Sequence, residues 1–146
     1  MELWKSVNTE EDIEILMDEY YCFHDACIVS VSYKSGTNVD NEGTMHFNNA
    51  NAHQMTVLFQ SQMAKKSLEL NFIGLRQAHL VGWQNNFLNV ISDAYLEFVD
   101  NLLPGEPERS IVWASNDWFD PNKNDGSVHE PADSYIVANE LKWRFV

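Results

Sequence analysis

The amino-acid sequence predicts an α+β fold in which one N-terminal amphipathic helix packs on a curved, mostly antiparallel β-sheet of about seven to eight strands. Two observations lead to this prediction. Apolar residues follow a helical period once, near the N-terminus, whereas several later segments alternate apolar and polar residues. Short polar connectors separate the alternating segments, as an antiparallel meander requires.

The helix is predicted to begin at a cap formed by Asn8 or Thr9. Glu11 follows Asn8 by three positions, which is the spacing of a capping box. The apolar residues of the segment fall on one face: Ile13, Leu16, Met17 and Tyr20. The other positions are mainly acidic: Glu10, Glu11, Asp12, Glu14, Asp18 and Glu19. We therefore expect a helix with one buried face and one strongly acidic face.

A strand is predicted over residues 27–33, because the apolar residues change there to a period of two. His24 and Asp25 form the turn that leads from the helix into this strand. Neighbouring residues on extended backbone point to opposite faces, so we expect these two side chains not to touch.

Three further strands are predicted from the same alternation: residues 44–47, 53–62 and 65–73. Residues 74–84 show no clear period and are predicted to be irregular. Residues 87–100 fit either one helix or two strands broken near Ser92 and Asp93. Their β-branched and aromatic content favours the two strands.

Residues 104–107 contain two prolines and a glycine, which deny the backbone the donors and dihedrals of regular structure. A strand is predicted over residues 110–114, followed by a polar loop over residues 116–131. The last strand, residues 135–146, ends so close to the last residue that we expect it to be held in the sheet.

The length of 146 residues fits one domain, residues 1–146, and the chain carries 22 acidic and nine basic residues for a net charge of −13. Such a surface repels nucleic acid and anionic lipid, so we expect neither as a partner, and it attracts a basic protein. No stretch approaches the roughly 20 apolar residues of a membrane span. No secretory signal is visible, which predicts a cytoplasmic protein.

The sequence contains no motif of a known catalytic site, which favours a role other than catalysis, and no cofactor is expected. Cys22 and Cys27 are predicted to be reduced thiols, since two cysteines alone do not complete a structural zinc site. The candidate metal ligands are histidines: His24, His46 and His53. His46 and His53 are expected to approach each other across a hairpin.

The five tryptophans divide into core residues and one candidate for exposure. Trp113 and Trp143 lie in predicted strands, and we expect both in the core. Trp118 stands at the head of the polar loop, between Asp117 and Asp120. An exposed aromatic residue beside carboxylates is typical of a surface that binds a basic partner.

Three phrases carry a resemblance: Phe23-His24-Asp25-Ala26, Ile111-Val112-Trp113-Ala114 and Ala138-Asn139-Glu140-Leu141-Lys142-Trp143-Arg144. In them the chain resembles a family of small, acidic, uncharacterised bacterial proteins of about this length. In size, acidity and the order of helix and strands it is also similar to immunity proteins of bacterial toxin systems. Neither resemblance implies a particular site residue.

We therefore expect a non-enzymatic acidic protein-binding module, an immunity-type inhibitor that occludes a basic surface of its partner. The candidate contact residues are Glu14, Asp18, Asp117, Trp118 and Asp120. The alternative is a protein that binds a metal or a small ligand through His24, His46 or His53 near a cavity of the sheet. A homo-oligomer that pairs through an exposed sheet edge is a third interpretation.

Overall fold

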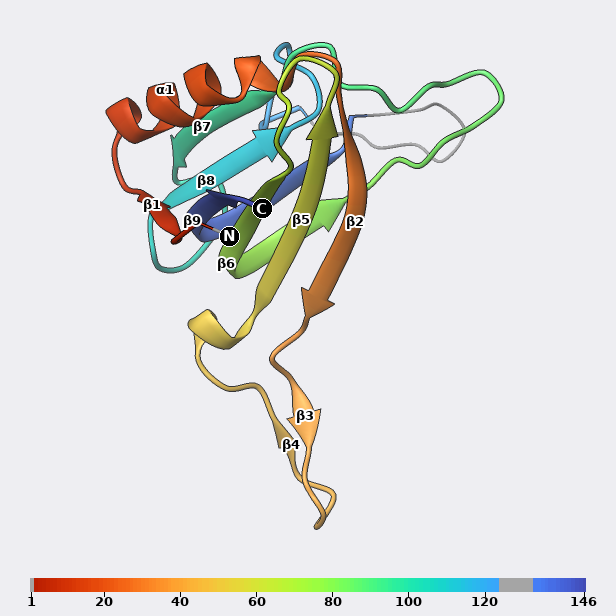
Figure 1. Cartoon of the computed structure of the whole chain (residues 1–146). Helices are drawn as coiled ribbons and strands as arrows, with labels where there is room; N and C mark the ends of the chain where they lie inside the picture. The colour runs from red at the N-terminus through yellow and green to blue at the C-terminus, as the bar shows by residue number, and fades with distance from the viewer. Residues whose placement is uncertain (1, 124–132) are drawn as a thin grey trace.

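The computed structural model describes residues 2–123 and 133–146. Within these ranges the chain forms one α-helix and nine β-strands, most of them in one antiparallel sheet (Figure 1). The expected number of strands was too low because β1 (Lys5–Val7) and β3 (Asn38–Val39) are too short to show an alternation. None of the helices in the described ranges has the length and apolar content to cross a membrane.

The remaining elements follow in chain order: α1 (Glu10–Glu19), η1 (Tyr21–Phe23), β2 (Ala26–Lys34), β4 (Met45–His46), η2 (Ala50–Ala52), β5 (Gln54–Ser61), β6 (Leu68–His79), β7 (Tyr95–Asp100), β8 (Arg109–Ala114) and β9 (Tyr135–Phe145). The main sheet has the order β2-β5-β6-β9-β8-β7, and β1 pairs with β9. The sheet is open, with β2 at one edge and β7 at the other. Its strands turn progressively, so that β7 and β8 cross β2 and β5 at a steep angle (Figure 1).

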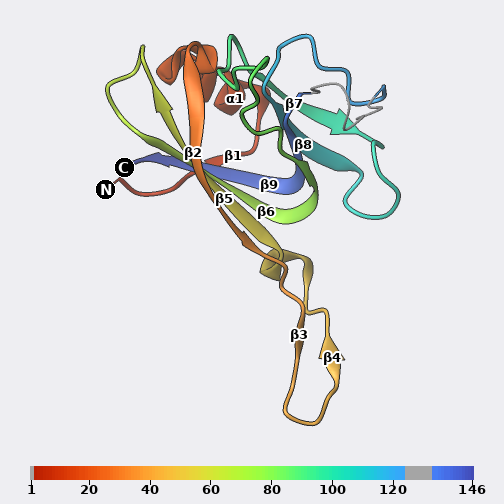
Figure 2. The ribbon, with the colours of Figure 1, turned by 90° about the vertical axis from the view of Figure 1, so that its right-hand side faces the viewer.

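The segment that connects β2 to β5 contains a separate two-stranded ladder formed by β3 and β4. We name residues 35–53, which include this ladder, the arm. Figure 2 shows the arm extending away from the main sheet as a continuation of β2 and β5. The side chains at its outer end are exposed.

The long strands β6 and β9 bend together (Figure 2), Gly74 of β6 lies against Asn139 of β9, and the register shifts just beyond, between Leu75 and Gln77. Gly74 has a φ of +67°, and a Cβ atom there would lie 2.5 Å from Nδ2 of Asn139. Beyond the bend β6 continues to pair with β9 as far as His79. The prediction that residues 74–84 are irregular was therefore wrong for 74–79, because a glycine that permits a bend resembles a strand end in sequence.

The segment 87–100 contains one strand, β7, and not the two that its composition predicts. Its first part belongs to a loop, residues 80–92, which makes only two isolated bridges. Phe87 bridges Gln84 within the loop, and Ile91 bridges Ala26 at the start of β2. In this loop Leu88 and Val90 are exposed, whereas Ile91 is buried.

Helix α1 begins at Thr9, whose Oγ1 accepts from the N–H of Asp12 at 3.1 Å. Asp12 in turn accepts from the N–H groups of Asn8 and Thr9, so the capping box is formed by Thr9 and Asp12 and not by Asn8 and Glu11. These N–H groups stabilise the carboxylate and lower the pKa of Asp12.

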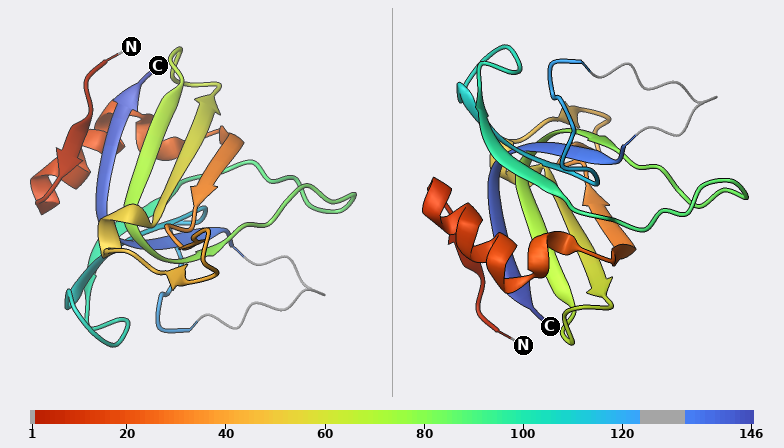
Figure 3. Two further views of the ribbon diagram at one scale, coloured as in Figure 1. Left: turned by 90° about the horizontal axis from the view of Figure 1, so that it is seen from below. Right: turned by 90° about the horizontal axis from the view of Figure 1, so that it is seen from above.

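Helix α1 lies on one side of the strands, behind them in the left view of Figure 3 and in front of them in the right view. Ile13 and Leu16 are buried, as is Tyr20 directly after the helix, whereas the apolar Ile15 is exposed. Below the turn that follows α1, aromatic side chains form the centre of the core. Each of these rings contacts the next, with centroids 5.1 to 5.3 Å apart, in the order Tyr20, Phe23, Phe59 and Trp113.

Candidate functional site

The turn between α1 and β2 has an unusual backbone. Tyr21, Cys22, Phe23 and Asp25 all have φ between 52° and 60°, in the left-handed region. For residues other than glycine this conformation costs about 1–2 kcal/mol each. Strain of this kind persists only where surrounding contacts enforce it, and it concentrates at functional sites.

Hydrogen bonds from distant segments hold this turn in place. The N–H of Asp25 donates to the carbonyl of Ile91 at 2.8 Å, and the N–H of Ala94 donates to the carbonyl of Cys22 at 2.9 Å. The carbonyl of Asp25 accepts from the N–H of Gln62 at 3.1 Å. The turn is thus joined on both sides to segments that follow it by many residues.

The charges of carboxylates from three parts of the chain act on the thiol of Cys22. Partial burial raises the pKa of Cys22, and the charges of Asp93, Asp18 and Asp117 raise it further. Asp18 comes from α1, Asp93 from the segment before β7, and Asp117 from the loop after β8. We name these three residues the acidic cluster.

His24 lies beside this cluster. Its Nδ1 atom donates to the carbonyl of Ser92 and lies 3.3 Å from Oδ1 of Asp93, while its Nε2 atom lies 3.5 Å from Oδ2 of Asp25. The Ser92 carbonyl, followed by the charge of Asp25, raises the pKa of His24. The expectation that His24 and Asp25 do not touch was wrong, because Asp25 is left-handed and not extended.

The predicted contact residues fall into two groups. Asp18 and Asp117 lie close enough to act on the same thiol, and Glu14 is exposed on α1. Trp118, directly after Asp117, is 88% exposed. Its backbone N–H donates to Oδ1 of Asn116 at 3.0 Å. Trp113 and Trp143 are buried, as expected.

Asp120 belongs to the other group because it faces a different residue. Its charge adds to the effects of burial and of Glu97, all of which raise the pKa of Tyr95. Its Oδ1 atom accepts from the N–H of Asn122 at 2.9 Å. Asp120 therefore lies toward β7, and nothing joins it to the thiol of Cys22.

The three histidines lie in separate environments. Nε2 of His46 lies 2.8 Å from Oδ2 of Asp40 on the arm, whereas His53 is half-buried before β5. They do not face each other across a hairpin, because β4 pairs with β3 and β5 pairs with β2 and β6. Across residues 2–123 and 133–146, no three side chains of His, Cys, Asp or Glu are placed to share a metal ion.

Ser92 and Asp93 were missed as site residues by sequence reasoning, which treated them only as a break between strands. Their contact with His24 depends on the bridge between Ile91 and Ala26, for which the sequence gives no signal. The strained turn was missed for a related reason, since no glycine marks its left-handed residues.

Comparisons with models of protein families, with curated proteins and with solved structures found no match to this chain. Its functional class therefore has to be inferred from the fold and the site. In the described residues these are an antiparallel sheet with one α-helix, a strained turn, and an exposed tryptophan next to Asp117.

Proposed function

We propose that this protein is a non-enzymatic binding module, whose acidic cluster and Trp118 contact a basic partner protein. The observation that carries the proposal is that the exposed carboxylates of Asp18 and Asp117, together with Asp93, all act on the pKa of the Cys22 thiol. Carboxylates gathered on one surface attract cations and speed their association. The exposed indole of Trp118 would supply the apolar anchor that such interfaces need.

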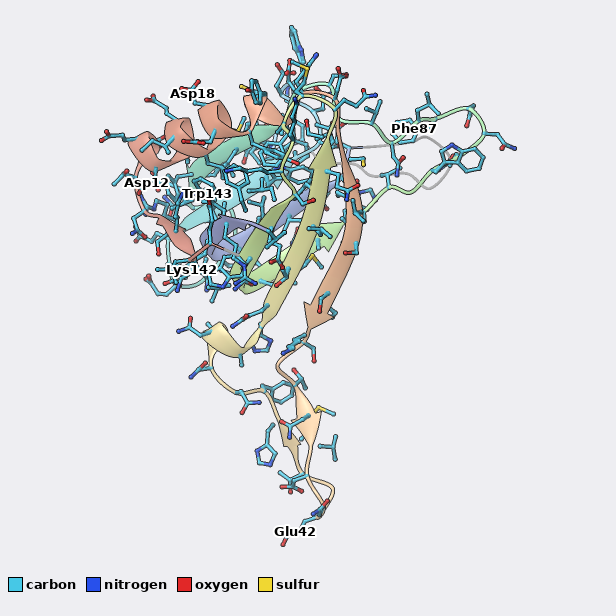
Figure 4. All side chains as sticks on the ribbon, viewed as in Figure 1. Asp12, Asp18, Glu42, Phe87, Lys142 and Trp143 are labelled. Carbon is cyan, nitrogen blue, oxygen red and sulfur yellow. The ribbon has the colours of Figure 1, made fainter. Side chains whose placement is uncertain are left out.

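The charges of the rest of the molecule support this direction. The outward side of α1 adds exposed carboxylates beside the cluster, and Figure 4 shows Asp18 on that side of the helix. Several cations are engaged elsewhere: Arg144 lies 2.9 Å from Glu69, and Nζ of Lys5 lies 4.4 Å from the ring centroid of Trp143. The surface of α1 and the cluster is thus the strongly negative side that a basic protein would meet.

The chemistry of Cys22 favours binding over nucleophilic catalysis. A catalytic thiol needs a lowered pKa, because the thiolate is the reactive form. The surrounding carboxylates raise the pKa of Cys22 instead. Lysine or arginine side chains of a partner would neutralise the charges of these carboxylates.

An immunity-type mechanism follows from this arrangement. A toxin that acts on nucleic acid has a basic surface that receives phosphates. The carboxylates of Glu14, Asp18 and Asp117 would take the positions of those phosphates, and Trp118 would add buried apolar area. The bound protein would then exclude the substrate without reacting with it.

The experiment compares two variants with equal changes in net charge. Asp18→Lys/Asp117→Lys alters the cluster side, whereas Glu106→Lys/Glu108→Lys alters exposed residues in the connection between β7 and β8. Immobilised protein is exposed to lysate of the source organism, and retained proteins are identified by mass. The affinity of a purified candidate is then measured by calorimetry at low and high salt.

We expect a basic protein that both wild type and the Glu106/Glu108 variant retain. The Asp18/Asp117 variant should bind it at least about tenfold more weakly, and high salt should weaken the wild-type complex. Equal binding by the two variants would show that the acidic cluster is not part of the interface. Failure to retain any basic protein would count against the proposed function itself.

A further inference from the structure

Three neighbouring segments of this strongly acidic protein contain no acidic or basic residue. Residues 26–33, 43–64 and 80–92 contain no Asp, Glu, Lys or Arg, although the chain holds 22 acidic residues. These segments include β2 up to Tyr33, all of β5 and the whole loop 80–92. We name the surface that they form the neutral face.

The neutral face includes a free strand edge. Strand β2 pairs with β5 on one side, and on its other side Ile91 bridges only Ala26. In the part of the chain that the structure describes, no strand pairs with the outer side of β2 from Ile28 to Lys34. An edge of unpaired N–H and C=O groups is a template for another strand unless charges or prolines protect it. Before Lys34 this edge carries neither, and its one irregularity is a register shift against β5 between Ile28 and Ser30, which leaves Ser30 to Lys34 regular.

Exposed apolar side chains surround the free edge. On β2 they are Val29 and Tyr33; on the loop 80–92 they are Leu80, Trp83, Leu88 and Val90; on the arm they are Val39, Met45 and Phe47. A hollow of about 160 Å³ lies between Ile28 and the loop, and a wider one lies between Tyr33 and Leu80. Apolar surface of this extent marks a site of interaction.

We propose that the neutral face binds a second copy of this chain, with the two β2 strands pairing antiparallel about a twofold axis near Val31. Val31 is the middle residue of the free stretch from Ile28 to Lys34. In this register Ile28 of one copy therefore lies opposite Lys34 of the other. Such a pairing is self-complementary, as a twofold interface must be. It goes beyond the proposed function and does not depend on it.

The shape of the protein fits this pairing. Figures 1 and 2 show the loop 80–92 projecting near the start of β2, and the arm continuing from its other end. Figure 4 places Phe87 in that loop and Glu42 at the tip of the arm. Antiparallel pairing brings the end of one β2 to the start of the other, so the arm of each copy reaches the loop of its partner. A strand pair alone buries less than a stable interface needs, and these two apolar contacts supply the remainder.

The distribution of charge selects a second copy over a basic partner at this face. Uncharged residues oppose uncharged residues across the twofold axis, so α1 of each copy is kept off the interface. The pairing also brings Lys34 of each copy toward the end of β2 where Asp25 and Asp93 of the other copy lie. A basic protein would find no carboxylate on the neutral face itself.

The test places charges at two exposed positions that face each other in this register. Ser30 of one copy would lie opposite Ser32 of the other, and both side chains are exposed in the monomer. In Ser30→Lys/Ser32→Lys, lysines oppose lysines; in Ser30→Lys/Ser32→Glu, each lysine opposes a glutamate. The dissociation constant of the purified protein is measured by sedimentation equilibrium, with circular dichroism to confirm that each variant is folded.

We expect a wild-type dimer, a dissociation constant at least about tenfold higher for the lysine pair, and a return to near the wild-type value for the lysine–glutamate pair. A monomeric wild type overturns the proposal. So does a dimer that the lysine pair leaves unchanged, and equal weakening by both pairs overturns the antiparallel register. Asp18→Lys/Asp117→Lys should dimerise at least as tightly as wild type, which separates this result from the test of the proposed function.

Discussion

Nδ1 of His24 lies 3.3 Å from Oδ1 of Asp93, although the two residues are 69 positions apart in the sequence. This contact joins the strained turn after α1 to the segment before β7. It also places an imidazole where Ser92 and Asp25 favour its protonated form.

The first prediction concerns the pKa of His24. The Ser92 carbonyl, Asp25 and Asp93 all raise it above its ordinary value of 6.5, so Asp93→Asn should lower it. A titration of the imidazole resonances by NMR measures both values. An unchanged pKa in Asp93→Asn would show that the contact between His24 and Asp93 is not formed.

The raised pKa of His24 also fixes the pH dependence of stability. Because the folded state binds this proton more tightly than the unfolded state, the stabilisation is fully present below pH 6.5 and is lost as pH rises through the folded pKa. The difference in melting temperature between wild type and His24→Gln should therefore be largest in mild acid and shrink toward alkaline pH.

The second prediction uses Cys22 as a reporter of the acidic cluster. In a Cys27→Ser background, Asp117→Asn should speed alkylation of Cys22 by iodoacetamide at mildly alkaline pH, because loss of the negative charge lowers the pKa of the thiol. Glu106→Gln serves as the control, since the charges that raise this pKa do not include Glu106. Equal rates in the two variants would contradict the convergence of Asp117 on Cys22.

The third prediction concerns the bend in β6 and β9. Gly74→Ala forces a Cβ atom against Asn139 at a left-handed position, and should cost about 2–4 kcal/mol of the free energy of unfolding in urea. Gly105 is the matched control, since its φ is +94° but nothing lies within 4 Å of a Cβ atom. Gly105→Ala should cost about 1 kcal/mol, and equal losses at the two sites would contradict the close approach at Asn139.

The fourth prediction distinguishes the two possible caps of α1. Thr9→Ala removes the hydroxyl that accepts from the backbone N–H of Asp12, and should lower the free energy of unfolding by about 1 kcal/mol. Asn8→Ala should cost less than about 0.5 kcal/mol, because only backbone atoms of Asn8 take part in the cap. The reverse order in urea denaturation would restore the alternative cap.

The elements with a strong period were predictable from the sequence. Strands β2, β5 and β9 and the start of β6 alternate cleanly, and the structure confirms them to within a few residues at each end. The errors occur where local signals compete with tertiary ones. Gly74 suggests an end but permits a bend, and residues 87–91 have strand-forming composition but no neighbouring strand to pair with.

The candidate site was predictable only in parts. Asp18, Asp117 and Trp118 were candidates because carboxylates beside an aromatic residue favour a basic partner, and of these expectations the structure confirms the exposure of Trp118. Their convergence with Asp93 could not be predicted, since it depends on a left-handed turn without glycine and on a bridge to Ile91. Such contacts are properties of the assembled fold and leave no periodic pattern in the chain.

The arm leaves the main sheet at a single point. Lys34 and Gln54 are partners across β2 and β5, so the pairing of these two strands is complete before the arm begins. Its two legs come together at Gly36, where a Cβ atom would lie 2.8 Å from the backbone of Ala52. A two-residue Asn-Gly turn from Lys34 to Gln54 would leave every strand of the main sheet with its present neighbours. Replacement of the arm by such a turn would therefore keep the strand pairing of the main sheet, and the bond that it removes from that sheet is the one from the N–H of Leu75 to the carbonyl of His53.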